Sequence, residues 1–236
     1  MAIESQIYEI LTRRRFSREN PKNIKQLKQI IEDSIDKNQP IKLIGFWGVG
    51  PKDKANWADT SSCEHLHSLV MEIKKIYEPG VEFTFIFATL HGIHNNIKKK
   101  IISSYTKTME EIFRKYNFKF IYLDPLWKKY NIDSEKIKKI HKEKTKNWWS
   151  KIKNIDTIVK NARQRKHGKK SKYQAQFYYM MRDLEKEMLE KEFIGSIFHG
   201  FSSSKLDGVL PNMPTLYLFA RKSWSDTPWF VTREKN

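Results

Sequence analysis

One polar segment of the chain gathers two lysines and two carboxylates. Lys52, Lys54, Asp59 and Glu64 lie within 13 residues of the stretch PKDKANWADTSSCEHL. An ammonium group can hold a phosphate or a carboxylate, and a nearby carboxylate can orient that ammonium or take a proton from an amine. The segment therefore predicts either a site for anionic substrates or a solvated loop in which Asp59 or Thr60 caps the next helix.

Histidines form a second group with useful chemistry. His91 and His94 lie three residues apart in LHGIHNN, and His199 lies alone in SIFHGF. Histidine exchanges protons near neutral pH, so each of the three is a candidate for proton transfer as well as for a structural role. We expect no metal site, because no third ligand is fixed near His91 and His94, and His65 and His67 would point apart on a helix.

Three glycines in GFWGVG invite comparison with nucleotide-binding loops. Gly45, Gly48 and Gly50 follow a predicted strand, and glycines let backbone N–H groups approach an anion. A Walker loop has a lysine after its last glycine, where this chain has Pro51, and a dinucleotide fingerprint opens directly into a helix. An ordinary turn is the better interpretation.

A late helical segment carries one more candidate ligand for an anion. Arg182 and Glu185 lie three residues apart within a helix expected at 173–192, so they can form an ion pair on the helix surface. Otherwise Arg182 is available to bind a carboxylate or a phosphate.

The positive charge of the chain is unevenly spread. The formal net charge is +18, and residues 128–172 hold 17 basic and 4 acidic side chains. Clustered positive charge attracts polyanions, and Trp148 and Trp149 in this segment offer rings for stacking on unpaired bases. However, 35 of the 45 basic residues are Lys, whereas base-specific recognition usually relies on Arg. A nucleic-acid-binding protein therefore stays as an alternative.

Composition excludes several other classes of protein. No run approaches the roughly 18 apolar residues of a membrane-spanning helix, and the 9 Gly and 8 Pro are too few for a fibrous chain. The first residues lack the order of a secretory signal. Cys63 is the single cysteine, so no internal disulfide forms, and we expect a cytoplasmic protein without a membrane partner.

Hydrophobic spacing predicts helices alternating with strands. An amphipathic helix is expected at 22–37 and another at about 62–77. Short apolar runs rich in β-formers predict strands at 41–47, 83–88 and 118–123. A third helix joins the last two of these strands, which gives the order β-α-β-α-β.

Strands joined by helical crossovers favour a parallel, right-handed sheet. Ligands of such sheets bind at the carboxyl ends of the strands, where this chain has expected loops at 48–61 and 89–96. We therefore expect a pocket between these loops, faced by a lysine of the first loop and by His199.

The predicted fold class is α/β, with a Rossmann-like, mostly parallel sheet, helices on both faces and a helical, Lys-rich cap. Segments at 196–201 and 215–220 are expected to complete the sheet. The expected division of the chain is an N-terminal helical layer at 1–40, a Rossmann-like core at 41–127, a basic helical cap at 128–172 and a final helix with strands at 173–236.

Several segments, in order along the chain, resemble the isocyanide (isonitrile) synthase family of pyoverdine and dityrosine biosynthesis. The matching segments are PKDKANWADTSSCEHL, IYEPGVEFTFIF, the helix with Tyr105, SIFHGF around His199, and Thr227-Pro228-Trp229. The resemblance implies a Rossmann-like domain with a helical cap that acts without metal or nucleotide cofactor. The family condenses an aromatic amino acid with ribulose 5-phosphate and leaves an isocyanide carbon on the α-nitrogen.

The resemblance also implies roles for the candidate residues. These are anion binding by Lys52 and Lys54, amine or proton handling by Asp59 and Glu64, proton transfer by His91, His94 and His199, and substrate binding by Tyr105, Arg182 and Trp229. The expected partners are an amino acid, whose identity is left open, and a sugar phosphate. Another small-molecule transferase on the same fold, such as a methyltransferase, is a further alternative.

Overall fold

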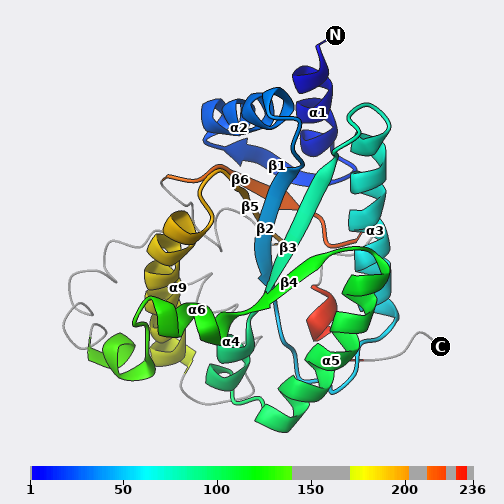
Figure 1. Cartoon of the computed structure of the whole chain (residues 1–236). Helices are drawn as coiled ribbons and strands as arrows, with labels where there is room; N and C mark the ends of the chain where they lie inside the picture. Colours follow the sequence, from blue (N-terminus) through cyan, green and yellow to red (C-terminus); the bar gives the residue numbers. More distant parts are fainter. Residues whose placement is uncertain (1, 140–170, 202–211, 222–226, 233–236) are drawn as a thin grey trace. The chain divides into compact units, whose positions relative to one another are not determined.

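The computed structural model has an α/β fold and describes residues 2–139, 171–201, 212–221 and 227–232. The chain divides into two compact units, the first made of residues 1–122 and 193–236 and the second of residues 123–192. The first unit contains a six-stranded sheet (Figure 1). None of the helices within the described ranges is long and apolar enough to cross a membrane.

The sheet is mostly parallel. Its strands, in spatial order, are β1 (Ser17–Lys22), β6 (Thr215–Leu218), β5 (Ile197–Gly200), β2 (Ile41–Trp47), β3 (Val81–Phe87) and β4 (Lys119–Tyr122). Only the edge pair β1–β6 is antiparallel. The predicted parallel order of the strands at 41–47, 83–88 and 118–123 is confirmed, and so is the Rossmann-like α/β class.

Helices of the first unit lie before β1 and in the connections between successive strands from β1 to β4. They are α1 (Ile3–Thr12), α2 (Ile24–Asp36), α3 (Trp57–Lys74), α4 (Thr89–His94) and α5 (Lys99–Lys115). Helices α3 and α5 lie together along one side of the sheet (Figure 1). Their apolar stripes, with Leu66, Leu69 and Met109 among them, pack on the rings and aliphatic side chains of β2 and β3 in one core.

Successive side chains of the central strand β2 point to opposite faces of the sheet. Trp47 joins the core under α3 and α5, whereas Phe46 points to the opposite face, where its ring lies 5.3 Å from the ring of His91 on α4. Helices therefore cover both faces of the sheet. Because both of its faces are covered, β2 is an almost continuous apolar run.

Gly45 lies in the middle of the sheet, between Phe85 of β3 and His199 of β5. A Cβ atom at this position would come within 2.4 Å of the His199 carbonyl oxygen and 2.5 Å of its ring. The absence of a side chain on Gly45 therefore makes room for the His199 ring.

Three local expectations differ from the structure. The segment 89–96 was expected as a loop, but Thr89–His94 forms helix α4. Helix α3 begins at Trp57 rather than near residue 62, because Asn56 caps it and Asp59 completes a capping box. The polar strand β1 was not expected, because its pairing with β6 rather than its composition places it in the sheet.

The second unit is described by helices α6 (Leu123–Lys129) and α9 (Ser171–Glu192). Helix α9 confirms the helix expected at 173–192. Most of the basic segment 128–172 lies outside the described residues.

Replacing Gly45 with alanine tests the close contact at the centre of the sheet. Gly45→Ala should lower the free energy of unfolding by about 3 kcal/mol, because backbone and ring must both move. Gly92→Ala is the control, because its Cβ would come close only to the flexible end of Ile102 and would meet Val49 at an ordinary contact distance of 3.5 Å. It should change stability by no more than about 1 kcal/mol. Urea denaturation measures both, and equal effects would contradict the prediction.

Candidate active site

Lys52 and Asp59 form a buried ion pair beyond the carboxyl end of β2. Lys52 Nζ lies 2.5 Å from Asp59 Oδ2, and the two side chains are 7% and 0% exposed. The backbone N–H of Asn56 donates to the same oxygen at 2.8 Å. Asp59 lies in the first turn of α3, where the helix dipole also favours a carboxylate.

The second oxygen of Asp59 ends a chain of buried hydrogen bonds. Tyr105 Oη donates to Asp59 Oδ1 at 2.7 Å, and Trp47 Nε1 donates to Tyr105 Oη at 3.0 Å. All three side chains are fully buried. This chain links β2, α5 and α3, and a buried polar network with its donors and acceptors paired makes such a junction rigid.

Lys52 also binds the C-terminal part of the chain. Its Nζ donates to the carbonyl of Pro228 at 2.8 Å, to Asn56 Oδ1 at 3.1 Å and, at a longer 3.4 Å, to the carbonyl of Val231. An ammonium has three N–H donors, so those of Lys52 are all engaged. An anion would have to displace one of these acceptors, and anion binding by Lys52 stays a prediction.

Trp229 fills the space that two glycines leave open. A Cβ atom on Gly48 would meet the Trp229 ring at 2.3 Å, and one on Gly50 would meet the Trp229 carbonyl oxygen at 1.5 Å. The ring also packs against Trp47 and Phe201, with centroid distances of 5.6 and 5.8 Å. These glycines therefore permit the close packing of Trp229.

Burial sets the electrostatics of the network. It lowers the pKa of Lys52, an effect that the Asp59 carboxylate opposes and the charge of Arg221 reinforces. Burial also raises the pKa of Tyr105 well above its usual value, and the neighbouring Asp59 adds to this shift. Tyr105 is therefore a neutral phenol at physiological pH, and its hydroxyl donates a hydrogen bond to the Asp59 carboxylate.

Sequence reasoning missed the contribution of Arg221. This side chain is 3% exposed, and its guanidinium lies 5.1 Å from the centre of the Trp57 ring. Two buried cations, Lys52 and Arg221, thus lie near one buried carboxylate at the start of α3. No spacing in the sequence relates Arg221 to Trp57, since 163 residues separate them.

His199 lies on the same face of the sheet as this network, inside the aromatic core. Its ring is 0% exposed and contacts the rings of Phe83, Phe85 and Phe201 at centroid distances of 5.2 to 5.5 Å. Neither ring nitrogen has a hydrogen-bond partner among the described residues. Burial lowers the pKa of His199 to about 3, so the ring is neutral at physiological pH.

The other two candidate histidines lie on helix α4, and the structure separates them from this network. His91 is buried against Phe46 on the opposite face of the sheet, and His94 is partly exposed in the last turn of α4. Helix α4 does follow the carboxyl end of β3, where this segment was expected. Their roles in proton transfer stay predictions.

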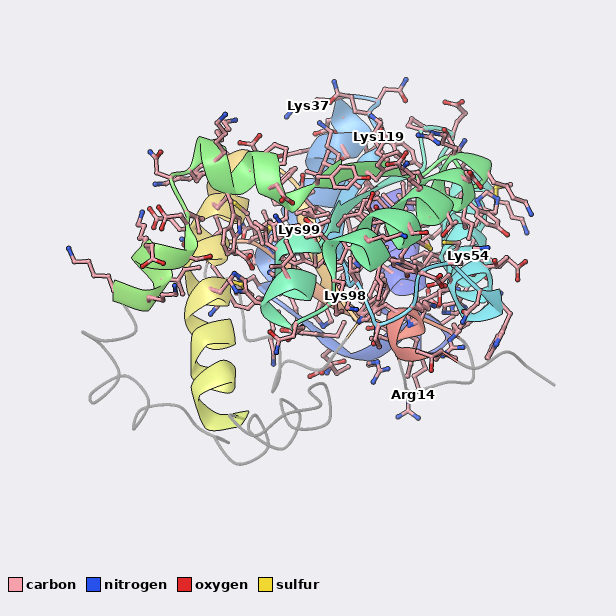
Figure 2. All side chains as sticks on the ribbon, turned by 90° about the horizontal axis from the view of Figure 1, so that it is seen from below. Arg14, Lys37, Lys54, Lys98, Lys99 and Lys119 are labelled. Atoms are coloured by element: carbon pink, nitrogen blue, oxygen red, sulfur yellow. The ribbon has the colours of Figure 1, made fainter. Side chains whose placement is uncertain are left out.

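Lys54 and Glu64 lie at the surface. The Lys54 side chain is exposed, and Figure 2 shows it at the edge of the first unit. Glu64 is exposed too, and it accepts a hydrogen bond from Tyr116 Oη at 3.3 Å. Lys54 therefore has its ammonium in solvent, whereas that of Lys52 is enclosed.

Arg182 belongs to the second unit. Its Nη1 lies 3.3 Å from Oε2 of Glu185, a carboxylate that is fully buried and also accepts from Trp127 Nε1 at 2.9 Å. The predicted pairing of Arg182 with Glu185 is confirmed, but the pair does not lie at the surface, because its side chains are only 14% and 0% exposed. Binding of a substrate anion by Arg182 stays a prediction.

The hollows lined by described residues of the first unit include two that lie away from the network. One, of about 170 Å³, lies near the amino ends of β2 and β5 and is lined by Gln39, Lys42 and Gly195 among others. The other, of about 160 Å³, lies between α1 and α2. Within the described part of the chain, no group of three His, Cys, Asp or Glu residues could hold a metal ion.

Comparison with known proteins adds information on the fold. No family model and no curated protein sequence matches the chain. The fold is similar to that of PvcA from Pseudomonas aeruginosa. The TM-score is 0.73 at 14% sequence identity, and the match covers 97% of this chain and 87% of PvcA. The resemblance to the isocyanide synthase family, of which PvcA is a member, is thereby confirmed for the fold.

Two tyrosyl-tRNA synthetases are also similar in fold. The enzyme of Pyrococcus horikoshii, complexed with L-tyrosine, gives a TM-score of 0.55 at 13% identity, and that of Aeropyrum pernix gives 0.51 at 12%. The matches cover 93% and 92% of this chain but only 60% and 61% of the synthetases. The common part is the Rossmann-like fold.

Removing the hydroxyl of Tyr105 tests the buried network. Tyr105→Phe should lower the free energy of unfolding by about 2–4 kcal/mol, because Asp59 Oδ1 and Trp47 Nε1 each lose a partner inside the core. Tyr116→Phe removes a surface hydroxyl and should stay within about 0.5 kcal/mol of the parent. Chemical denaturation of both variants measures the difference, and a loss as small for Tyr105 as for Tyr116 would argue against the network.

His199 should make stability depend on pH. Its pKa is about 3 in the folded chain and about 6.5 in the unfolded chain, so as the pH falls the unfolded chain binds a proton that the folded chain does not. The contribution of the neutral His199 ring to the free energy of unfolding is fully present above about pH 6.5. Between about pH 6.5 and pH 3 it falls by up to about 1.4 kcal/mol for each unit that the pH is lowered.

Urea unfolding at pH 7 and pH 5 measures this dependence. His199→Leu should reduce the loss of stability between the two values by about 2 kcal/mol. His94→Leu, at a partly exposed position, is the control and should leave the loss nearly as in the parent. An unchanged pH dependence in His199→Leu would count against a neutral, buried His199.

Proposed function

We propose that the chain is an isocyanide synthase-like enzyme, which condenses the α-amine of an amino acid with a phosphorylated ketose. The observation that carries this proposal is the likeness to PvcA over 97% of the chain. The Rossmann-like fold is also compatible with amino-acid recognition, since one of the similar synthetases is complexed with L-tyrosine.

The first chemical step is bond formation between the amine and the ketone. The free amine nitrogen attacks the ketone carbon, the carbonyl electron pair moves to oxygen, and a proton passes from nitrogen to that oxygen. The step requires a group that takes a proton, a group that gives one, and cations for the phosphate and the carboxylate.

The described side chains suggest how these tasks are divided. Lys54 is exposed and is proposed to bind the sugar phosphate, while the partly exposed Trp229 is proposed to contact the amino acid. Among the groups proposed for proton transfer, His94 and Glu64 reach solvent. Asp59 and Tyr105 are buried and act by holding the loop and helix that carry the contacting groups.

The alternative of another small-molecule transferase on the same fold has no nucleotide-binding motif to support it. The glycines of GFWGVG do not match such a motif, and Gly48 and Gly50 lie directly against Trp229. We therefore propose the ketose condensation, which needs no nucleotide, as the function of the chain.

Mass spectrometry of the products tests this function. The protein is incubated with pooled amino acids and uniformly ¹³C-labelled ribulose 5-phosphate, and one amino acid should gain a single labelled carbon and lose two hydrogens. Lys54→Met should raise the KM for the ketose about tenfold, because a charge-assisted contact to the phosphate is lost.

Lys99→Met is the matched control, because Lys99 is also an exposed lysine of the first unit (Figure 2). Its kinetics should match those of the parent. If no amino acid acquires labelled carbon under any condition, the proposed function is wrong.

A further inference from the structure

Residues 227–232, here called the C-terminal strap, are fastened by buried donors from the loop before α3. Lys52 Nζ binds the carbonyl of Pro228 at 2.8 Å and that of Val231 at 3.4 Å. Asn56 Nδ2 binds the same carbonyl of Val231 at 2.7 Å. These bonds lie on both sides of Trp229 in sequence and so fix the backbone that carries its ring.

The opposite side of the strap rests on glycines. Gly50 lies so close to the Trp229 carbonyl, and Gly48 so close to its ring, that a Cβ atom on either would overlap with Trp229. Trp47 and Phe201 contact the ring from the core. The Trp229 ring is therefore clamped, yet the residue keeps part of its surface exposed.

The choice of a lysine at position 52 follows from this geometry. Two backbone carbonyls, one amide oxygen and one carboxylate surround a single point, and an ammonium supplies several donors from a single atom. The pairing with Asp59 compensates the charge of Lys52 in this buried position. Lys52 thereby holds the C-terminal strap through backbone carbonyls, so these contacts do not depend on the side chains of the strap.

We propose that Lys52 is a positioning residue, whose buried ammonium fixes the strap so that the Trp229 ring forms one wall of the amino-acid site. This inference rests on the proposed function, because an amino-acid substrate is what the exposed part of Trp229 would contact. A preorganised ring binds an apolar or aromatic side chain without the cost of ordering a flexible one.

Fluorine NMR of protein labelled with 5-fluorotryptophan tests the fastening without any substrate. The chain has 7 Trp, and Trp229→Phe identifies the Trp229 signal. Lys52→Met should shift and broaden that signal. Gly50→Ala should do the same while leaving the Lys52–Asp59 pair in place, and it decides the matter if Lys52→Met does not fold. Lys99→Met should leave the signal unchanged.

Calorimetric titration with L-tyrosine, L-tryptophan and inorganic phosphate tests whether the Trp229 ring forms a wall of the amino-acid site. Both Lys52→Met and Gly50→Ala should weaken binding of the preferred amino acid about 10- to 100-fold, as expected for a misplaced contact surface. Binding of phosphate should stay as in the parent. A merely structural Lys52 would not produce this selective loss.

Three results would overturn the inference. If Lys52→Met abolishes phosphate binding and leaves the Trp229 signal in place, Lys52 is an anion ligand. If the signal moves but amino-acid binding does not change, Trp229 is not a wall of the site. If the parent protein binds neither amino acid, Trp229 is not a wall for an aromatic substrate. The labelled-ketose experiment then decides the proposed function separately, and the NMR result decides whether Lys52 fastens the strap.

Discussion

A charge inside a protein must be paired, and the buried pair of Lys52 and Asp59 organises the first unit around this requirement. Its partners come from parts of the chain that are far apart in sequence. Asp59 is held by the cap of α3 and by Tyr105 of α5, and Lys52 is held by the carbonyl of Pro228. Removing either charge would leave the other without compensation in the core. The loop after β2, two helices and the C-terminal strap therefore hold their places together.

The sequence was sufficient to predict the parallel strands of the sheet, but not its edge strand β1 or the buried network. Apolar runs at 41–47, 83–88 and 118–123 carry a strong signal, because strands with both faces covered need apolar residues at nearly every position. The sequence also predicted that Lys52 and Asp59 lie near each other, because both belong to one short polar segment. Their burial could not be predicted, because it depends on coverage by a segment more than 160 residues later. The polar strand β1 was missed for the same reason, since pairing with β6 outweighs its composition.

Strand alternation explains why the candidate histidines divide between the faces of the sheet. Gly45 and Phe46 are neighbours in β2 and so point to opposite faces, and each contacts a different histidine: His199 at Gly45 and His91 at Phe46. The spacing of the histidines in the sequence could not show which face of the sheet each of them contacts. His199 lies within β5 and is enclosed by rings, whereas His91 lies on α4 against Phe46, so the two histidines occupy different environments and are suited to different roles.

The two lysines of the polar segment divide in the same way, and this division links the fold to the proposed chemistry. Lys52 has its donors engaged by Asp59, Asn56 and the strap, while Lys54 has its ammonium in solvent. A lysine whose N–H groups donate to acceptors within the protein fixes the local structure, whereas the ammonium of a lysine in solvent is available to bind an incoming anion. Two identical side chains two residues apart thus differ in role because only one of them is covered by the strap. Any substitution that loosens the strap would therefore alter both the position of Trp229 and the difference between the two lysines.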